Sequence, residues 1–136
     1  MRRALRKAYF PGRMQLIKVK NRMILLDGAH NPQKIAALVR SLKSFQHEKK
    51  FVFLFACLNS KDYGKMLRYI AKLAQKIIVT NFRLDTFDIM HISEQPKKIA
   101  KVLKKLNFLD YKIVKDPKKA LDYALKLCLA LNCKIA

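Results

Sequence analysis

The sequence predicts a three-layer, Rossmann-like α/β domain, whose mostly parallel sheet carries an antiparallel hairpin at one edge. Three observations indicate this fold class. First, short apolar runs alternate with stretches of helical period along most of the 136 residues. Second, Phe51–Cys57 is apolar throughout, as expected for a parallel strand that is covered on both faces. Third, Met14–Lys20 alternates apolar and polar residues shortly before the apolar run Met23–Leu26, which is typical of a hairpin with one half-exposed strand.

The first helix after this hairpin has the clearest boundaries. Asn31 can cap it, because its side-chain oxygen can accept a backbone N–H of the first turn. Pro32 suits the first helical position, where its missing N–H is not needed. We expect the helix to run from Pro32 to Phe45 and to bury one apolar stripe. That stripe consists of Ile35, Leu38, Val39 and Leu42.

The later elements alternate between helix and strand, which predicts right-handed crossovers between parallel strands. Ser60 is expected to cap the second helix, which should reach about Gln75. The inward side of that helix should contain Met66, Leu67, Ile70, Leu73 and Ala74. The remaining expected elements are a strand at 76–80, a longer loop without a clear period at 81–95 that could contain a short strand or turn, a helix at 96–106, a strand at 111–114, a helix from the Asp116 cap to about residue 131, and the beginning of a last strand at 133–136.

The composition predicts one domain with a packed core, since 51% of the residues are hydrophobic. No apolar run approaches the roughly 18 to 20 residues that a membrane span requires. The basic stretch Met1–Tyr9 is not followed by a long apolar segment or a cleavage site, which argues against a secretory signal. Cys57, Cys128 and Cys133 lack zinc-type spacing, so we interpret them as buried thiols in a reducing cytoplasm.

The formal net charge of +21 results from 30 lysines and arginines against nine acidic residues. Nucleic-acid-binding proteins often have such a balance. However, the densest group of lysines, at positions 97, 98, 101, 104 and 105, alternates with the apolar stripe Ile99, Val102, Leu103 and Leu106. We therefore interpret these lysines as the solvated side of an amphipathic helix. A surface that binds polyanions is the alternative.

Met23–Pro32 is the candidate functional centre. A short buried strand ends at Asp27, Gly28 permits a sharp turn, and His30 lies on the loop before the first helix. Ligands of open α/β sheets bind at such carboxyl ends of strands. The sequence contains no P-loop, no dinucleotide fingerprint, no nucleophile elbow and no metal-type ligand spacing. His47 and His91 have no neighbouring partners in the sequence and are expected on the surface.

Two motifs carry a resemblance to a known family. Phe10–Gln15 reads F-P-G-R-M-Q, and Leu26–Pro32 reads L-D-G-A-H-N-P after a short hairpin. This pair resembles the signature of the folylpolyglutamate synthases and bifunctional dihydrofolate synthases, which are relatives of the Mur ligases. Asn59–Tyr63, N-S-K-D-Y, is similar to a further segment of that family. The resemblance covers essentially the whole chain, but only the C-terminal domain of such an enzyme.

The resemblance implies an ATP- and Mg²⁺-dependent ligase that phosphorylates a substrate carboxylate, which the amino group of glutamate then attacks. By their motif positions, Arg13 and Asp27 resemble the residues of this domain that contact ATP. His30 resembles the catalytic residue near the incoming glutamate and the acyl phosphate. The phosphate-binding loop and most metal ligands belong to the N-terminal ATPase domain of the family, so no metal ligand is assigned to this sequence.

The resemblance also implies how the chain is organised. Residues 1–9 would be the remnant of a linker, and residues 10–136 a Mur-ligase-type C-terminal domain with a truncated last strand. Such a fragment is expected to be inactive alone, because the N-terminal ATPase domain would be missing. Its partners in the full enzyme would be that domain, ATP, L-glutamate, and folate or dihydropteroate. The alternatives are a stand-alone basic module that binds nucleic acid and a ligase of cell-wall precursors; PGR and GAHNP argue against the latter.

Overall fold

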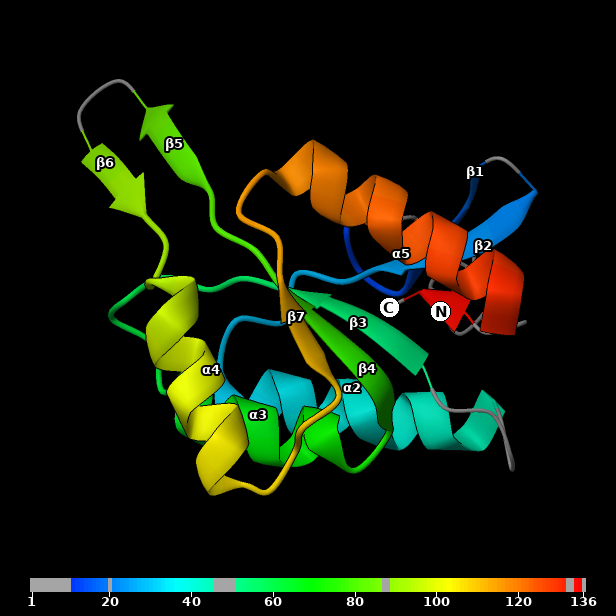
Figure 1. Ribbon diagram of the computed structural model, residues 1–136, viewed down its shortest axis with the longest axis horizontal. Coiled ribbons are helices and arrows are strands. Elements are labelled where there is room, and N and C mark those ends of the chain that lie inside the picture. Colours follow the sequence, from blue (N-terminus) through cyan, green and yellow to red (C-terminus); the bar gives the residue numbers. More distant parts are fainter. Residues whose placement is uncertain (1–10, 20, 46–50, 87–88, 132–133, 136) are drawn as a thin grey trace, which may run out of the picture.

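The computed structural model describes residues 11–19, 21–45, 51–86, 89–131 and 134–135 (Figure 1). The expected linker at 1–9, His47 and Cys133 lie outside these ranges. The strands are β1 (Gln15–Val19), β2 (Arg22–Leu26), β3 (Phe51–Phe55), β4 (Ala74–Val79), β5 (Arg83–Thr86), β6 (Ile89–Ile92), β7 (Tyr111–Ile113) and β8 (Lys134–Ile135). The helices are α2 (Pro32–Phe45), α3 (Tyr63–Ala71), α4 (Pro96–Lys105) and α5 (Pro117–Leu131).

Six strands form the main sheet in the order β1-β2-β8-β3-β4-β7. Strand β1 is antiparallel to β2, and the other neighbours are parallel. The predicted parallel sheet with an antiparallel edge hairpin is therefore confirmed. The two-residue strand β8 lies between β2 and β3, where Ile135 pairs with Ile24 on one side and with Val52 on the other.

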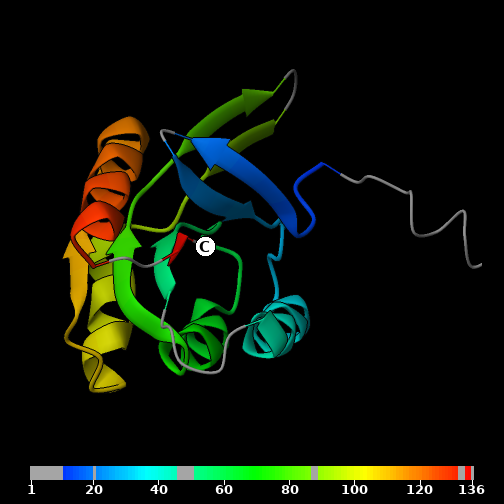
Figure 2. The same cartoon turned by 90° about the vertical axis from the view of Figure 1, so that its right-hand side faces the viewer.

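The helices cover the sheet from both sides, which gives the three predicted layers (Figures 1 and 2). Helices α2, α3 and α4 pack on one face and α5 packs on the other. Because side chains alternate along a strand, β3 and β4 contribute to a core on each face. Ile77 and Val79 belong to the core under α2–α4, whereas Ile78 belongs to the core under α5. All three are fully buried.

Helices α2 and α5 begin and end where the sequence predicts. The Asn31 side chain accepts the backbone N–H of Lys34 at 2.9 Å, and Asp116 caps α5 through Lys119 at 2.8 Å. Within α2, the predicted stripe is buried except for Leu38, which is partly buried. Helix α4 ends one residue earlier than expected.

The prediction for α3 was wrong at both ends. Asp62, not Ser60, is the N-cap, and its carboxylate accepts the backbone N–H of Lys65 at 3.1 Å. The helix stops at Ala71 because the next residues are needed by the sheet. Leu73 accepts a hydrogen bond from the backbone N–H of Phe51, and Ala74 already pairs with Phe51 in β4. Met66, Leu67 and Ile70 are buried as predicted.

The segment expected as a loop at 81–95 contains a second, two-stranded sheet. Strands β5 and β6 pair with each other as an antiparallel hairpin that projects from the main sheet (Figure 1). Each strand has four residues, which is too short for a convincing two-residue period in the sequence.

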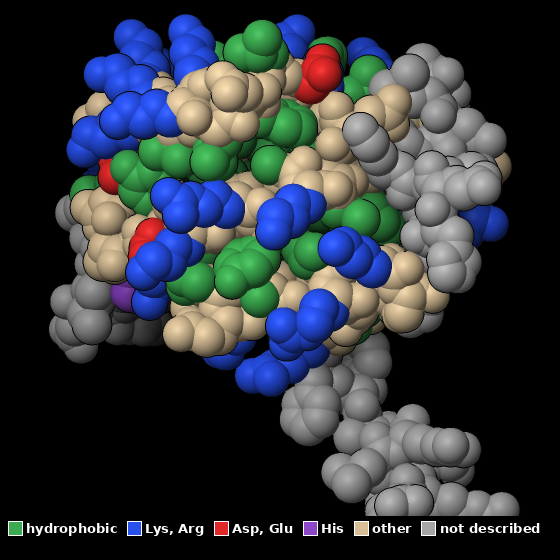
Figure 3. Space-filling view, turned by 90° about the horizontal axis from the view of Figure 1, so that it is seen from below, with side chains coloured by type: hydrophobic (Ala, Val, Ile, Leu, Met, Phe, Trp, Pro, Cys, Tyr) green, Lys and Arg blue, Asp and Glu red, His purple; other side chains and the backbone are tan. Residues whose placement is uncertain are grey.

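The outer face of α2, α3 and α4 is strongly basic. Figure 3 shows lysine and arginine side chains across the width of this face, with apolar patches between them. Exposed lysines also lie on α5, at positions 118, 119 and 126. None of the helices in the described ranges is both long and apolar enough to cross a membrane.

Candidate functional site

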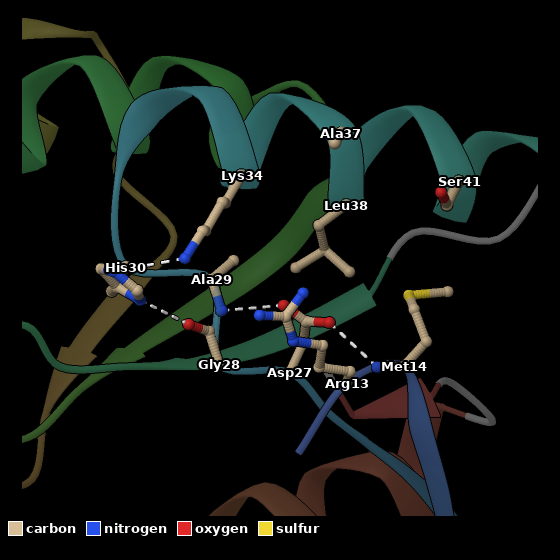
Figure 4. A pocket seen from close by; sticks show the side chains of 10 residues that line it. All are labelled: Arg13, Met14, Asp27, Gly28, Ala29, His30, Lys34, Ala37, Leu38 and Ser41. Carbon is tan, nitrogen blue, oxygen red and sulfur yellow. Dashed lines mark hydrogen bonds between the residues drawn. The ribbon is translucent and has the colours of Figure 1, made fainter. Parts of the chain in front are cut away.

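The carboxylate of Asp27 joins the two sequence motifs. It follows β2, and its Oδ2 accepts the backbone N–H of Met14 at 2.9 Å while its Oδ1 accepts that of Ala29 at 2.8 Å (Figure 4). Hydrogen bonds to a charged acceptor are stronger than bonds between neutral groups. Asp27 therefore holds the turn before β1 and the loop after β2 in one arrangement, although 13 positions separate it from Met14.

Two glycines let these backbones approach. Gly12 has a φ of +70°, a conformation that favours glycine, and its carbonyl accepts the backbone N–H of Gly28 at 2.6 Å. A Cβ atom on Gly28 would lie 3.4 Å from that carbonyl oxygen, which is a tight contact. The sequence-based interpretation of Gly28 as a turn residue is thus refined, because the close approach to Gly12 is what its small size permits.

Arg13, Asp27 and His30 line one cavity of about 300 Å³ beside α2. Figure 4 shows Arg13 and Asp27 under the helix, with His30 near its first turn. Arg13 is exposed, so its guanidinium is accessible. The structure therefore brings the three candidate residues together, at the carboxyl end of β2 where the sequence placed them.

Hydrogen bonds fix the ring of His30. Its Nδ1 lies 2.9 Å from the Gly28 carbonyl oxygen, and a carbonyl can only accept, so Nδ1 carries the proton. Its Nε2 lies 3.4 Å from Nζ of Lys34 and accepts from that ammonium group. This arrangement places the imidazole ring beside a lysine at the rim of the cavity.

A second cavity of about 440 Å³ shares His30 and Ala29 with the first. It also contains Lys61, from the loop before α3, and His91 from β6. His91 is half-buried, and the β5–β6 hairpin brings it to the same cavity as His30, which the sequence did not predict. No sequence signal identified His91, whereas Lys61 stands in the N-S-K-D-Y segment.

A third cavity, of about 860 Å³, continues along the same edge of the sheet. Phe82 lines both the second and the third cavity. The third cavity lies between the ends of β4 and β7 and the beginnings of α4 and α5, and its cations are Arg83, Lys97 and Lys115. No motif in the sequence predicted this cavity.

A buried polar cluster stands between these cavities. The Glu94 carboxylate is buried and accepts the backbone N–H of Gln95 at 2.8 Å, and Lys98 lies 3.4 Å from it. These contacts lower the pKa of Glu94, which also hydrogen-bonds Tyr63. Burial, with a contribution from Glu94, raises the pKa of the Cys57 thiol to about 11, so this thiol is protonated and unreactive at neutral pH.

Acid should weaken the fold through Glu94. Because its pKa is lower in the folded than in the unfolded chain, its stabilising effect is complete above about pH 4.3 and is lost as the pH falls through the folded pKa. We expect the urea midpoint of the wild type to fall more steeply between pH 5 and pH 3 than that of Glu94→Gln. Lys98→Gln should show an intermediate slope, and equal slopes in all three proteins would contradict this assignment.

Comparison with known proteins identifies the family. Residues 12–131 match the sequence model of the family described as "Mur ligase, glutamate ligase domain". The chain belongs to this family. This result confirms the resemblance noted in the two motifs and the expectation of a Mur-ligase-type C-terminal domain fold.

In the described ranges, no three His, Cys, Asp or Glu residues are grouped so that they could hold a metal ion.

Relatives of this Mur ligase domain include folate enzymes and a UDP-N-acetylmuramoyl-L-alanyl-D-glutamate--2,6-diaminopimelate ligase of Leptospira borgpetersenii, which is 32% identical over 52% of this chain and 15% of that protein. The dihydrofolate synthase/folylpolyglutamate synthase of Bacillus subtilis is 28% identical over 102 residues, which cover 70% of this chain and 24% of that protein. The folylpolyglutamate synthase of Thermotoga maritima is 27% identical, with a TM-score of 0.69, over 89% of this chain and 27% of that chain.

The folylpolyglutamate synthase of Mycobacterium tuberculosis, crystallised with ADP, has a TM-score of 0.71 and 21% identity, over 90% of this chain and 26% of that chain. At this identity the likeness shows the fold alone. The chain thus spans about a quarter of the length of these relatives.

Proposed function

We propose that this chain is the nucleotide-closing, glutamate-side domain of an ATP-dependent folate–glutamate ligase. The observation that supports this most strongly is the pair of hydrogen bonds that the Asp27 carboxylate accepts from the backbone of Met14 and Ala29, which we name the Asp27 clamp. The clamp holds Arg13 and the His30 loop on one cavity wall. Arg13 would face the phosphates of the nucleotide, and His30 would face the reacting carboxyl group and the incoming glutamate. Whether the acceptor is dihydropteroate or a folate is a property of the rest of such an enzyme.

The residues in the first cavity fit a nucleotide chemically. The Arg13 guanidinium offers a permanent charge and a planar fork of donors for phosphate oxygens. A carboxylate has about four lone-pair sites, and backbone N–H groups use two of those of Asp27, so two remain for ribose hydroxyls. A cavity of about 300 Å³ suits one wall of a site that a second domain completes.

Bound ATP would supply the phosphoryl group that activates the substrate carboxylate. His30 is the residue of this chain that we assign to that reaction, because it lies where the first and second cavities meet. Lys34 donates to its Nε2 in the free domain. A substrate carboxylate or acyl-phosphate oxygen would compete with Nε2 for the Lys34 ammonium donor, whose charge would stabilise that oxygen. The second cavity, with Lys61 and His91, would hold the carboxylates of glutamate.

The remainder of the proposed enzyme would provide the phosphate-binding loop and most ligands of Mg²⁺. We therefore expect no ligation from these 136 residues alone. Such an enzyme would work in the cytoplasm, where its substrates and ATP occur. The nucleic-acid alternative stays a prediction: the outer face of α2, α3 and α4 is basic, and exposed lysines also lie on α5, on the other side of the sheet.

A chimaera tests this function directly. Residues 11–135, which include β8, would replace the equivalent domain of the B. subtilis enzyme, and ATP-dependent addition of glutamate to folate would be measured. We expect Arg13→Ala and His30→Ala each to lower kcat by roughly 100-fold or more, as for the loss of other preorganised groups that stabilise charge. Arg40→Ala, on the exposed side of α2, is the matched control and should leave kcat unchanged.

A binding measurement separates a failed chimaera from a failed proposal. The 136-residue chain should bind a fluorescent ADP analogue weakly, and Arg13→Ala should bind it several-fold more weakly than Arg40→Ala does. If both substitutions weaken ADP binding equally, Arg13 does not contact the nucleotide. ATP-dependent glutamate ligation by the isolated chain would show that the domain is not merely one half of the site.

A further inference from the structure

Four lysines form an exposed row on α4. Lys97, Lys101 and Lys105 follow one another at intervals of four residues, and Lys104 lies beside them. All four are exposed, and among the described residues no carboxylate forms an ion pair with them. Lys98 is different, because it is paired with the buried Glu94. We name Lys97, Lys101, Lys104 and Lys105 the lysine row.

The lysine row begins beside a series of neighbouring cavities that starts at the candidate site. The first and second cavities share His30, the second and third share Phe82, and Lys97 lines the third. Lys97 also belongs to the first turn of α4, so the row begins at the rim of the third cavity. A flexible acidic chain could thus extend from His30 along the sheet edge to the outer face of α4. Figure 3 shows lysine and arginine side chains across the outer face formed by α2, α3 and α4.

The spacing of the row fits one kind of acidic chain. Helix residues four apart are separated by about 6 Å along the axis. A γ-linked glutamate adds two methylene bonds to the roughly 3.5 Å that an extended α-linked residue spans, so its carboxylates recur about every 6 Å. Lysine suits such isolated carboxylates as a point charge. Helix α4 has no aromatic residue on which a nucleic-acid base could stack.

We propose that the lysine row is a docking surface for poly-γ-glutamyl chains. This inference rests on the proposed function, since a folate–glutamate ligase would produce such chains. The row would retain the distal carboxylates of a long chain outside the reaction centre. Affinity should therefore increase with the number of γ-linked glutamates and decrease with ionic strength, because exposed ion pairs are screened by salt.

Fluorescence anisotropy with the 136-residue chain and labelled γ-linked hexaglutamate tests the proposal at low ionic strength. We expect Lys97→Gln/Lys101→Gln/Lys105→Gln to weaken binding about tenfold, the usual effect of losing three surface ion pairs. The control Lys43→Gln/Arg68→Gln/Lys72→Gln removes three exposed charges from α2 and α3 and should change binding less than threefold. Circular dichroism would verify that both variants are folded.

Two further probes test specificity. An α-linked hexaglutamate and a hexanucleotide should bind more weakly than the γ-linked chain. Equal or tighter binding of either probe, or equal losses in both triple variants, would overturn the proposal and show a general polyanion effect only. The hexaglutamate binding assay contains no nucleotide. A negative result would therefore not contradict the roles assigned to Arg13 and His30, and a failure of those roles would not change the binding of hexaglutamate.

Discussion

Asp27→Ala is expected to destabilise the domain by roughly 2 to 3 kcal/mol and to abolish nucleotide binding. The substitution leaves the backbone N–H groups of Met14 and Ala29 without their charged acceptor, and each lost bond costs about 1 to 3 kcal/mol. It also frees the turn that carries Arg13. Urea denaturation would give the loss of stability, and titration with a fluorescent ADP analogue would give the loss of binding.

A matched control separates the clamp from an ordinary cap. Asp116→Ala removes a carboxylate that accepts one local backbone N–H at the start of α5, so it should cost only about 1 kcal/mol and leave ADP binding intact. Asp27→Asn should fall between wild type and Asp27→Ala, because its amide keeps one acceptor oxygen. The clamp would be refuted if Asp27→Ala cost no more than Asp116→Ala.

Leu67→Ala is expected to lower the free energy of unfolding by about 3 kcal/mol. Leu67 is fully buried in α3, in the core between the sheet and the α2–α4 layer. Its truncation would leave a cavity that the surrounding core cannot fill, and such changes cost about 2 to 5 kcal/mol. The total free energy of unfolding of a domain of this size is only about 5 to 15 kcal/mol, so the loss should be easy to measure in a urea titration.

The neighbouring residue provides the control for this prediction. Arg68 is exposed on the same helix, and Arg68→Ala should stay within about 0.5 kcal/mol of wild type. Similar losses for the two substitutions would mean that the buried face of α3 is assigned incorrectly.

The sequence predicted those parts of the fold whose signals are local. The caps Asn31 and Asp116, each followed by proline, mark α2 and α5, and the apolar run after residue 50 marks a strand buried on both faces. The end of α3 was mispredicted because the chain after Ala71 pairs with β3 in the sheet. This tertiary pairing outweighs the helical periodicity of the sequence there. The β5–β6 hairpin was missed as a pair because its strands are too short to show a period.

The candidate site could also be predicted only in part. Arg13, Asp27 and His30 were found from two long motifs, and the structure brings them to one cavity. Lys34, His91 and the two further cavities were not predicted, since they depend on how separate elements meet at the sheet edge. The bonds of Asp27 to two loops likewise could not be deduced from spacing, because they join residues on both sides of a hairpin.

The position of β8 has a consequence for how the site can open. Among the described strands, β8 alone pairs with both β2 and β3, and it contributes only two residues. Separation of β8 would remove the backbone pairing that joins the β1–β2 hairpin, and with it the Arg13 turn, to β3, and would leave Ile24 and Leu25 to hold the hairpin through the two cores. Such partial opening costs less than global unfolding. A ligand bound by Arg13 and Asp27 would therefore slow amide exchange in β2, and a longer pairing at β8 would raise the closed population and tighten that ligand.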